Sequence, residues 1–216
     1  MKNRINLLAF GLLVAGSLAL SSCTKNDDST IALIGTEYYI DDILSVIPDS
    51  LETRFLAEFG SIHKGPVPPK VEGSYVMNPK QRVSSNLAEW PLQAVEPNVY
   101  LRFSDQHNGI VKMDLNEATE TVTDTVFVCG NGKAFTVYFI ENKTYEMPIN
   151  NQTYHVEMKR GIVMKGQVTS DGLSDFRYAT IIMDSEDDSN GLIGQYPKGS
   201  YFIYKDGDGL AKNEEW

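Results

Sequence analysis

Apolar residues recur at helical spacing near the start of the polar part of the chain. Over residues 37–47 they lie one, three or four positions apart, and Pro48 interrupts the pattern. A second stripe of the same kind begins at Asp49, which forms a capping-box-like pair with Glu52, and it ends before Gly60. The pattern predicts two short helices whose apolar sides pack on the domain that follows.

Alternating or continuous apolar runs of strand length fill the chain after Gly73. Asn-Gly and Asp-Gly dipeptides, which tight antiparallel hairpins require, lie between several runs. With a short opening strand at 73–77, about nine strands are predicted, the others at 99–103, 110–115, 121–128, 134–140, 153–160, 162–169, 176–183 and 201–204. They predict an all-β domain over 73–216, an antiparallel meander that forms a barrel or a sandwich. Residues 37–72, which end in a proline-rich stretch, are predicted to be a helical cap and connector.

Residues 1–22 have the layout of an export signal. Lys2 and Arg4 precede a mainly apolar stretch that is too short and wrongly flanked to span a membrane. The sequence Leu20-Ser21-Ser22-Cys23 follows, and it resembles the lipobox of bacterial lipoproteins. The resemblance implies cleavage before Cys23 and acylation of its thiol and its new amino group, so that two or three acyl chains hold the protein on a membrane. Residues 23–36 are then a lipidated tether; the alternative is an ordinary secreted protein with a chance cysteine.

Charge narrows the range of partners. The chain carries 19 Lys and Arg against 29 Asp and Glu, a net charge of −10, and loss of the two basic residues of the signal takes this to −12. So acidic a body is repelled by phosphate backbones, which excludes nucleic acid, and it is expected to meet the membrane through its lipid anchor. Once Cys23 is acylated, Cys129 has no partner for an intramolecular disulfide. We expect Cys129 to be buried and inert at the end of a strand.

The order of these features resembles the lipocalin-like lipoproteins of Gram-negative bacteria, which have calycin-type β-barrels. The shared features are the lipobox, a short helical opening, the stretch Glu72-Gly73-Ser74-Tyr75 and eight or more meandering strands. The resemblance implies an up-and-down barrel of about 8–9 strands whose interior is packed or holds one small ligand. It also implies an outer-membrane lipoprotein, on the periplasmic or the surface face, with the helices of residues 37–60 capping or plugging the barrel.

Inward-facing positions of such a barrel are the candidate ligand site. Every second residue of a strand faces the same side, and three predicted strands carry apolar series of this kind. The candidates are Phe135, Val137, Phe139, Ile162, Met164, Val168, Phe176 and Tyr178. The same faces also suit a dry core, since any β domain needs apolar faces to fold. Gly166, in the middle of one strand, indicates a gap or a bulge.

Other chemistry has little support in the sequence. The three histidines are far apart, the acidic run at 184–191 lacks the closing glutamate of a calcium loop, and no nucleophile or phosphate-binding motif is present. We therefore expect no metal, no cofactor and no enzymatic activity. The sequence favours a lipid-anchored envelope protein that binds a small apolar or amphipathic ligand inside its barrel. The alternative is a non-catalytic structural or interaction lipoprotein whose filled β domain docks an envelope protein partner.

Overall fold

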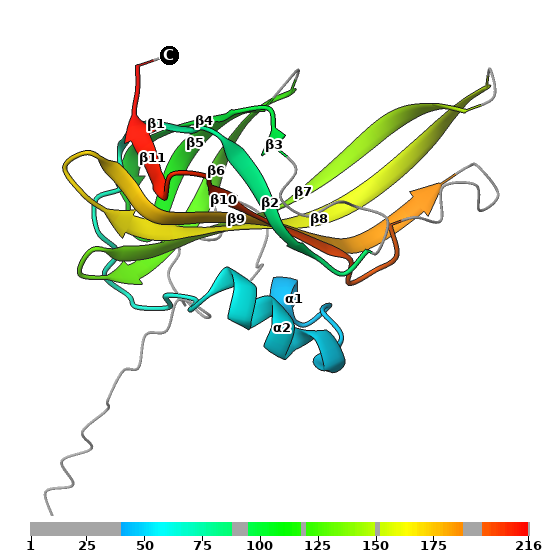
Figure 1. Ribbon diagram of the computed structural model, residues 1–216, viewed down its shortest axis with the longest axis horizontal. Helices are drawn as coiled ribbons and strands as arrows, with labels where there is room; N and C mark the ends of the chain where they lie inside the picture. Colours follow the sequence, from blue (N-terminus) through cyan, green and yellow to red (C-terminus); the bar gives the residue numbers. More distant parts are fainter. Residues whose placement is uncertain (1–39, 88–94, 118–119, 150–151, 188–195, 216) are drawn as a thin grey trace, which may run out of the picture.

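The computed structural model describes residues 40–87, 95–117, 120–149, 152–187 and 196–215 (Figure 1). Within these ranges the chain forms helices α1 (Ile40–Leu44) and α2 (Asp49–Phe59) and strands β1 (Gly73–Met77), β2 (Lys80–Ser85), β3 (Val95–Glu96), β4 (Val99–His107), β5 (Ile110–Glu117), β6 (Glu120–Asn131), β7 (Ala134–Ile149), β8 (Gln152–Val168), β9 (Gly172–Asp187), β10 (Tyr201–Asp206) and β11 (Leu210–Asn213). None of the helices found in these ranges has the length and apolar character needed to cross a membrane. The predicted signal at 1–22, Cys23 and the tether at 23–36 lie outside the described residues.

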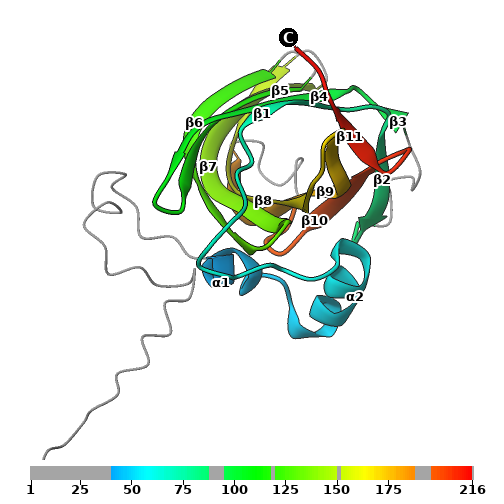
Figure 2. The same cartoon turned by 90° about the vertical axis from the view of Figure 1, so that its left-hand side faces the viewer.

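All eleven described strands belong to one antiparallel sheet, which confirms the predicted all-β class. Their order is β11-β1-β4-β5-β6-β7-β8-β9-β10-β2-β3. β4 to β9 are neighbours in sequence order, so the predicted meander is confirmed for this part of the sheet. β11 pairs with β9 as well as with β1, and this second pairing closes a ring of eight strands (Figure 2).

Turn residues set the register where the sequence predicts. Asn108 and Gly109 have φ of 48° and 76°, the left-handed backbone that a tight hairpin between β4 and β5 requires. The register of β8 against β9 shifts around Gly166, which is the predicted bulge. A Cβ on Gly166 would lie 3.3 Å from the rings of Phe135 and Phe176, so the glycine leaves room for two packed aromatic side chains.

The structure also corrects the predicted strands. The sequence predicts separate strands at 153–160 and 162–169, but β8 runs through both without a break. Its central Gly161 faces α1, because a Cβ there would lie 2.3 Å from Cγ2 of Ile43. Three strands, β2, β3 and β11, lie in segments without a hydrophobic strand pattern. β2 has the sequence KQRVSS, in which the buried positions of the first half are charged.

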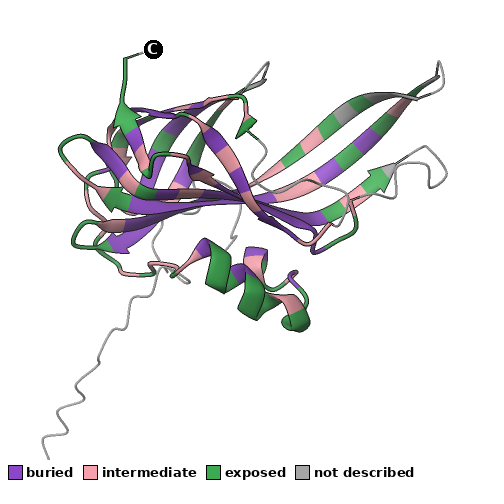
Figure 3. Ribbon diagram, viewed as in Figure 1, coloured by how far each residue is buried: buried purple, intermediate pink, exposed green. Residues whose placement is uncertain are grey.

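The helices cover the outside of the ring and not one of its ends (Figure 2). Over part of their length β7, β8 and β9 are apolar on both faces: Val137 packs in the inner cluster, and Tyr138 beside it packs in the outer one. The outer cluster joins the buried helix residues Ile40, Ile43, Phe55 and Phe59, and Ile47 between the helices, to Tyr138, Val163, Ala179, Ile181, Tyr201 and Ile203. In both helices the buried residues face the sheet (Figure 3). The predicted cap or plug is therefore corrected, because the apolar surface that needs covering is the outer face of the wall.

Candidate functional site

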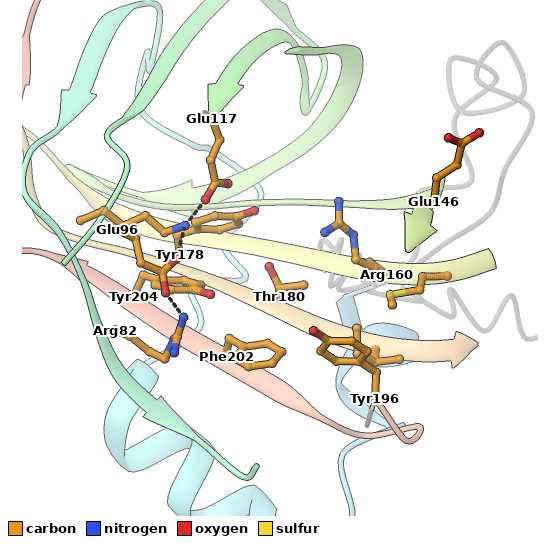
Figure 4. A pocket seen from close by; sticks show the side chains of 13 residues that line it. Arg82, Glu96, Glu117, Glu146, Arg160, Tyr178, Thr180, Tyr196, Phe202 and Tyr204 are labelled. Atoms are coloured by element: carbon orange, nitrogen blue, oxygen red, sulfur yellow. Dashed lines mark hydrogen bonds and ion pairs between the residues drawn. The ribbon is translucent and has the colours of Figure 1, made fainter. Parts of the chain in front are cut away.

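A cavity of about 400 Å³ lies where the sheet divides into two branches. Two strands pair with the edge of β9 that faces away from β8. Residues 172–174 of β9 pair with β11, and residues 177–181 pair with β10. One branch continues through β10, β2 and β3, and the other through β11, β1, β4 and β5. Residues from both branches line the cavity, which we call the branch pocket (Figure 4). Its lining is Lys80, Arg82, Glu96, Glu117, Glu146, Met158, Arg160, Tyr178, Thr180, Ile182, Tyr196, Phe202 and Tyr204.

The two ends of the branch pocket differ in chemistry. Figure 4 shows Arg82, Glu96 and Glu117 at one end, together with the rings of Tyr178 and Tyr204. Toward the other end Met158 and Ile182 form a small buried apolar cluster against which Tyr196 packs, and Arg160 and Glu146 also line this end. Thr180 and Phe202 lie between the two ends. The pocket therefore has one end of paired charges and aromatic rings, and another in which an apolar cluster lies beside one arginine and one glutamate.

Ion pairs across the branches close the charged end. The ammonium of Lys80 on β2 contacts Glu117 of β5 and lies 3.2 Å from Oε2 of Glu96 on β3. Arg82 pairs with the other carboxylate oxygen of Glu96. The side chains of Lys80 and Arg82 are only 2% and 6% exposed, whereas those of Glu96 and Glu117 are 18% and 25% exposed. The positive charges thus lie deeper in the protein than the negative charges that compensate them.

Aromatic rings support the same two cations. The Lys80 nitrogen lies 3.9 Å from the ring centroid of Tyr204, and the Arg82 guanidinium carbon lies 5.7 Å from that of Phe202. Burial lowers the pKa of Lys80, and the carboxylate of Glu117 opposes this shift. Burial raises the pKa of the Tyr178 and Tyr204 hydroxyls, so both keep their protons at neutral pH. The charged end is therefore rich in hydrogen-bond donors.

The start of β2, which carries Lys80, is fixed by a buried carboxylate. The backbone N–H of Asn78 donates to Asp206 at 2.9 Å, just after the chain crosses from one branch to the other. Asp206 pairs with Lys80 in the β10–β2 ladder. Burial, together with the carboxylate of Asp208, raises the pKa of Asp206 to about 6. This contact holds the ammonium of Lys80 in register with the pocket.

The eight predicted ligand residues lie in the inner cluster, seven as buried members and Val168 partly buried against it. The structure therefore brings them together on one face, as their alternation predicts. Of the eight, Tyr178 lines the branch pocket, and the other seven pack against one another in that cluster. Whether any of them touches a ligand stays a prediction.

The sequence reading missed the residues that give the branch pocket its charge. Lys80 and Arg82 lie two positions apart, which is the spacing of one strand face, but their strand lacks the apolar residues that mark a strand. Phe202 and Tyr204 have the same spacing on β10, within the predicted strand at 201–204. A search for charged and aromatic residues at alternate positions would have found both pairs.

Two other expectations concern reactive groups. Cys129 is buried, and its thiol donates a hydrogen bond to the carbonyl oxygen of His63 at 2.9 Å, as suits an inert position. Over the part of the chain that the structure describes, no three His, Cys, Asp or Glu side chains come together as metal ligands. The acidic run at 184–191 lies partly outside the described residues.

The chain was compared with protein-family models, with curated proteins and with solved structures, and no match was found. The lining of the branch pocket is therefore the basis on which a function is proposed.

Proposed function

We propose that this chain is a lipid-anchored protein of the Gram-negative envelope that binds a small amphipathic molecule in the branch pocket. The observation that carries the proposal is the mixed lining, in which paired charges lie at one end and an apolar cluster, Met158 and Ile182, lies beside Arg160 toward the other. Ligand pockets combine an apolar wall with a few placed polar groups, and their volumes begin at roughly 300 Å³. The branch pocket meets both conditions.

The proposal includes a lipocalin-like barrel as the scaffold. The closed ring of eight antiparallel strands and the meander of β4 to β9 support this interpretation. Within the ring, side chains such as Phe135, Val137 and Met164 are fully buried. We therefore assign the ligand to the branch pocket, beside this packed cluster.

The proposed lipid anchor and the proposed location in the outer membrane rest on the sequence. The basic and apolar layout of residues 1–22, followed by the lipobox and Cys23, favours acylation and placement in the outer membrane. An acidic domain on such an anchor is repelled by anionic head groups.

Filling the branch pocket tests the proposal. Thr180 is 8% exposed and lines the middle of the pocket, so Thr180→Phe places a ring in the cavity. We expect the mature chain, residues 23–216 made with Cys23→Ser so that no acyl chain competes, to bind the neutral fluorophore N-phenyl-1-naphthylamine. Thr180→Phe should weaken this binding by about tenfold or more, because the new ring takes the space in which the fluorophore makes its apolar contacts. A tenfold loss of affinity corresponds to about 1.4 kcal/mol of binding free energy. Fluorescence titration measures the affinity.

The matched control is Thr125→Phe, which makes the same change at an exposed position of β6. It should leave the affinity for the fluorophore unchanged. Equal affinities for the wild type and Thr180→Phe, or no binding by the wild type, would contradict the proposal and favour the non-catalytic interaction protein instead.

A further inference from the structure

In the branch pocket the side chains of the two cations are more deeply buried than those of the two glutamates that pair with them, and this difference bears on the charge of a ligand. We infer that the occupant is an amphiphile with an anionic head group, a carboxylate or a phosphate, which binds Lys80 and Arg82 while its apolar part lies toward Met158 and Ile182. The inference rests on the proposed function and adds to it the chemical class of the ligand and its orientation.

The cations of the charged end lie deeper than the carboxylates that compensate them. Lys80 and Arg82 are almost completely buried, whereas the side chains of Glu96 and Glu117 keep about a fifth to a quarter of their surface exposed. A glutamate at the rim can turn into water and recover its hydration. A buried ammonium or guanidinium cannot, so it needs another anion when its partner leaves. An anionic head group replaces the glutamate without leaving a buried charge unpaired.

The charged end also holds several hydrogen-bond donors. Lys80 and Arg82 supply charged donors, and Arg160 lines the pocket further along. The hydroxyl groups of Tyr178 and Tyr204 keep their protons, because burial raises the pKa of both. Charge-assisted hydrogen bonds to carboxylate or phosphate oxygens are stronger than those between neutral groups. A head group that only accepts hydrogen bonds matches such a set of donors.

The same end disfavours a ligand with a cationic head group. Aromatic faces attract cations, but Lys80 already lies over Tyr204 at 3.9 Å, and Arg82 lies near the rings of Phe202 and Tyr204. A ligand cation would have to displace a residue of its own sign that is tethered to the sheet. The rings and the carboxylates are therefore already used by the protein's own cations.

The orientation of the ligand follows from the polarity of the lining. Past Thr180 the wall includes Met158 and Ile182, both buried, with Tyr196 packed against them, and the polar ends of Arg160 and Glu146 lie beside this cluster. An alkyl chain that starts at Lys80 runs over Phe202 toward this cluster. Burial of each methylene there contributes about 0.8 kcal/mol, so a head group without a chain binds much more weakly than the whole amphiphile.

Four probes with the same alkyl chain test the inference, each used below its micelle-forming concentration. Isothermal titration calorimetry on the mature chain with Cys23→Ser compares laurate, dodecyl phosphate, dodecyltrimethylammonium and dodecyl maltoside, with inorganic phosphate as a head group alone. We expect laurate or dodecyl phosphate to bind at least about tenfold more tightly than the cationic and neutral probes, because each charge-assisted hydrogen bond adds more than a neutral one. Inorganic phosphate alone should bind weakly. Which of the two anions binds better distinguishes a carboxylate ligand from a phosphate ligand.

A variant that is expected to bind the ligand more tightly tests the inference even where a variant that weakens binding fails to fold. Arg82→Met should abolish the preference for anions, but it also removes a buried charge. Glu96→Gln removes the carboxylate that competes for both cations and retains its shape, so laurate should bind about tenfold more tightly. The matched control Glu157→Gln, on an exposed position of β8 outside the pocket, should change nothing.

The outcomes separate the inference from the proposed function. Equal binding of anionic, cationic and neutral probes would overturn the inference and leave the amphiphile pocket standing. Tighter binding of dodecyltrimethylammonium, or weaker binding of laurate by Glu96→Gln, would overturn it as well. Failure of all four probes and of the neutral fluorophore would overturn both.

Discussion

Replacing Phe55 by alanine is expected to lower the free energy of unfolding by about 3–5 kcal/mol, the usual range for a buried phenylalanine. Phe55 has no exposed surface and joins α2 to the outer face of the sheet. Its ring lies 5.3 Å from that of Phe59 and meets Tyr201 edge-on at 5.2 Å. Truncation therefore leaves a cavity between the helix and β10. Urea denaturation followed by circular dichroism measures the loss.

Leu56, the next residue of α2, is the matched control. It is 38% exposed, so Leu56→Ala should lower the free energy of unfolding by less than about 1 kcal/mol. If both substitutions have the same small effect, the helices are not docked on the wall of the ring. The assignment of α1 and α2 to the outer face would then be wrong.

The second large effect concerns the anchor. Changing Cys23 to serine is expected to abolish incorporation of radiolabelled palmitate into the protein made by its own cells, because acylation starts at the thiol and a hydroxyl is a much weaker nucleophile. Cys129→Ser is the matched control, since it removes the other cysteine of the chain and should retain the label. Label that persists after Cys23→Ser, or a wild-type protein that never takes it up, would refute the lipoprotein assignment.

Much of the sheet was predictable because its strands carry apolar residues that alternate or run continuously. β1 has the predicted bounds, and the Asn108-Gly109 turn lies where a hairpin was expected. The strand ends were less predictable: β7, β8 and β9 continue into polar segments, where pairing with a neighbour rather than hydrophobicity maintains the strand. Gly161 reads as a break between strands, yet it marks the contact with α1.

The branch pocket was harder to predict, and for a specific physical reason. Its position depends on β9 dividing its edge between β10 and β11, a long-range pairing that no local pattern reveals. Its charged end depends on Lys80 and Arg82, whose burial is tolerated because Glu96 and Glu117 reach them from other strands. Read along the chain, two basic residues in a polar segment indicate an exposed loop. Only the fold shows that they are buried together.

Native mass spectrometry of the protein extracted gently from its own membranes tests the central claim most directly. We predict a mass above that of the acylated chain, carried by a small molecule that leaves on denaturation and that is missing from the Thr180→Phe variant. A spectrum that contains the acylated chain alone, unchanged when amphiphiles are offered to it, would contradict the account.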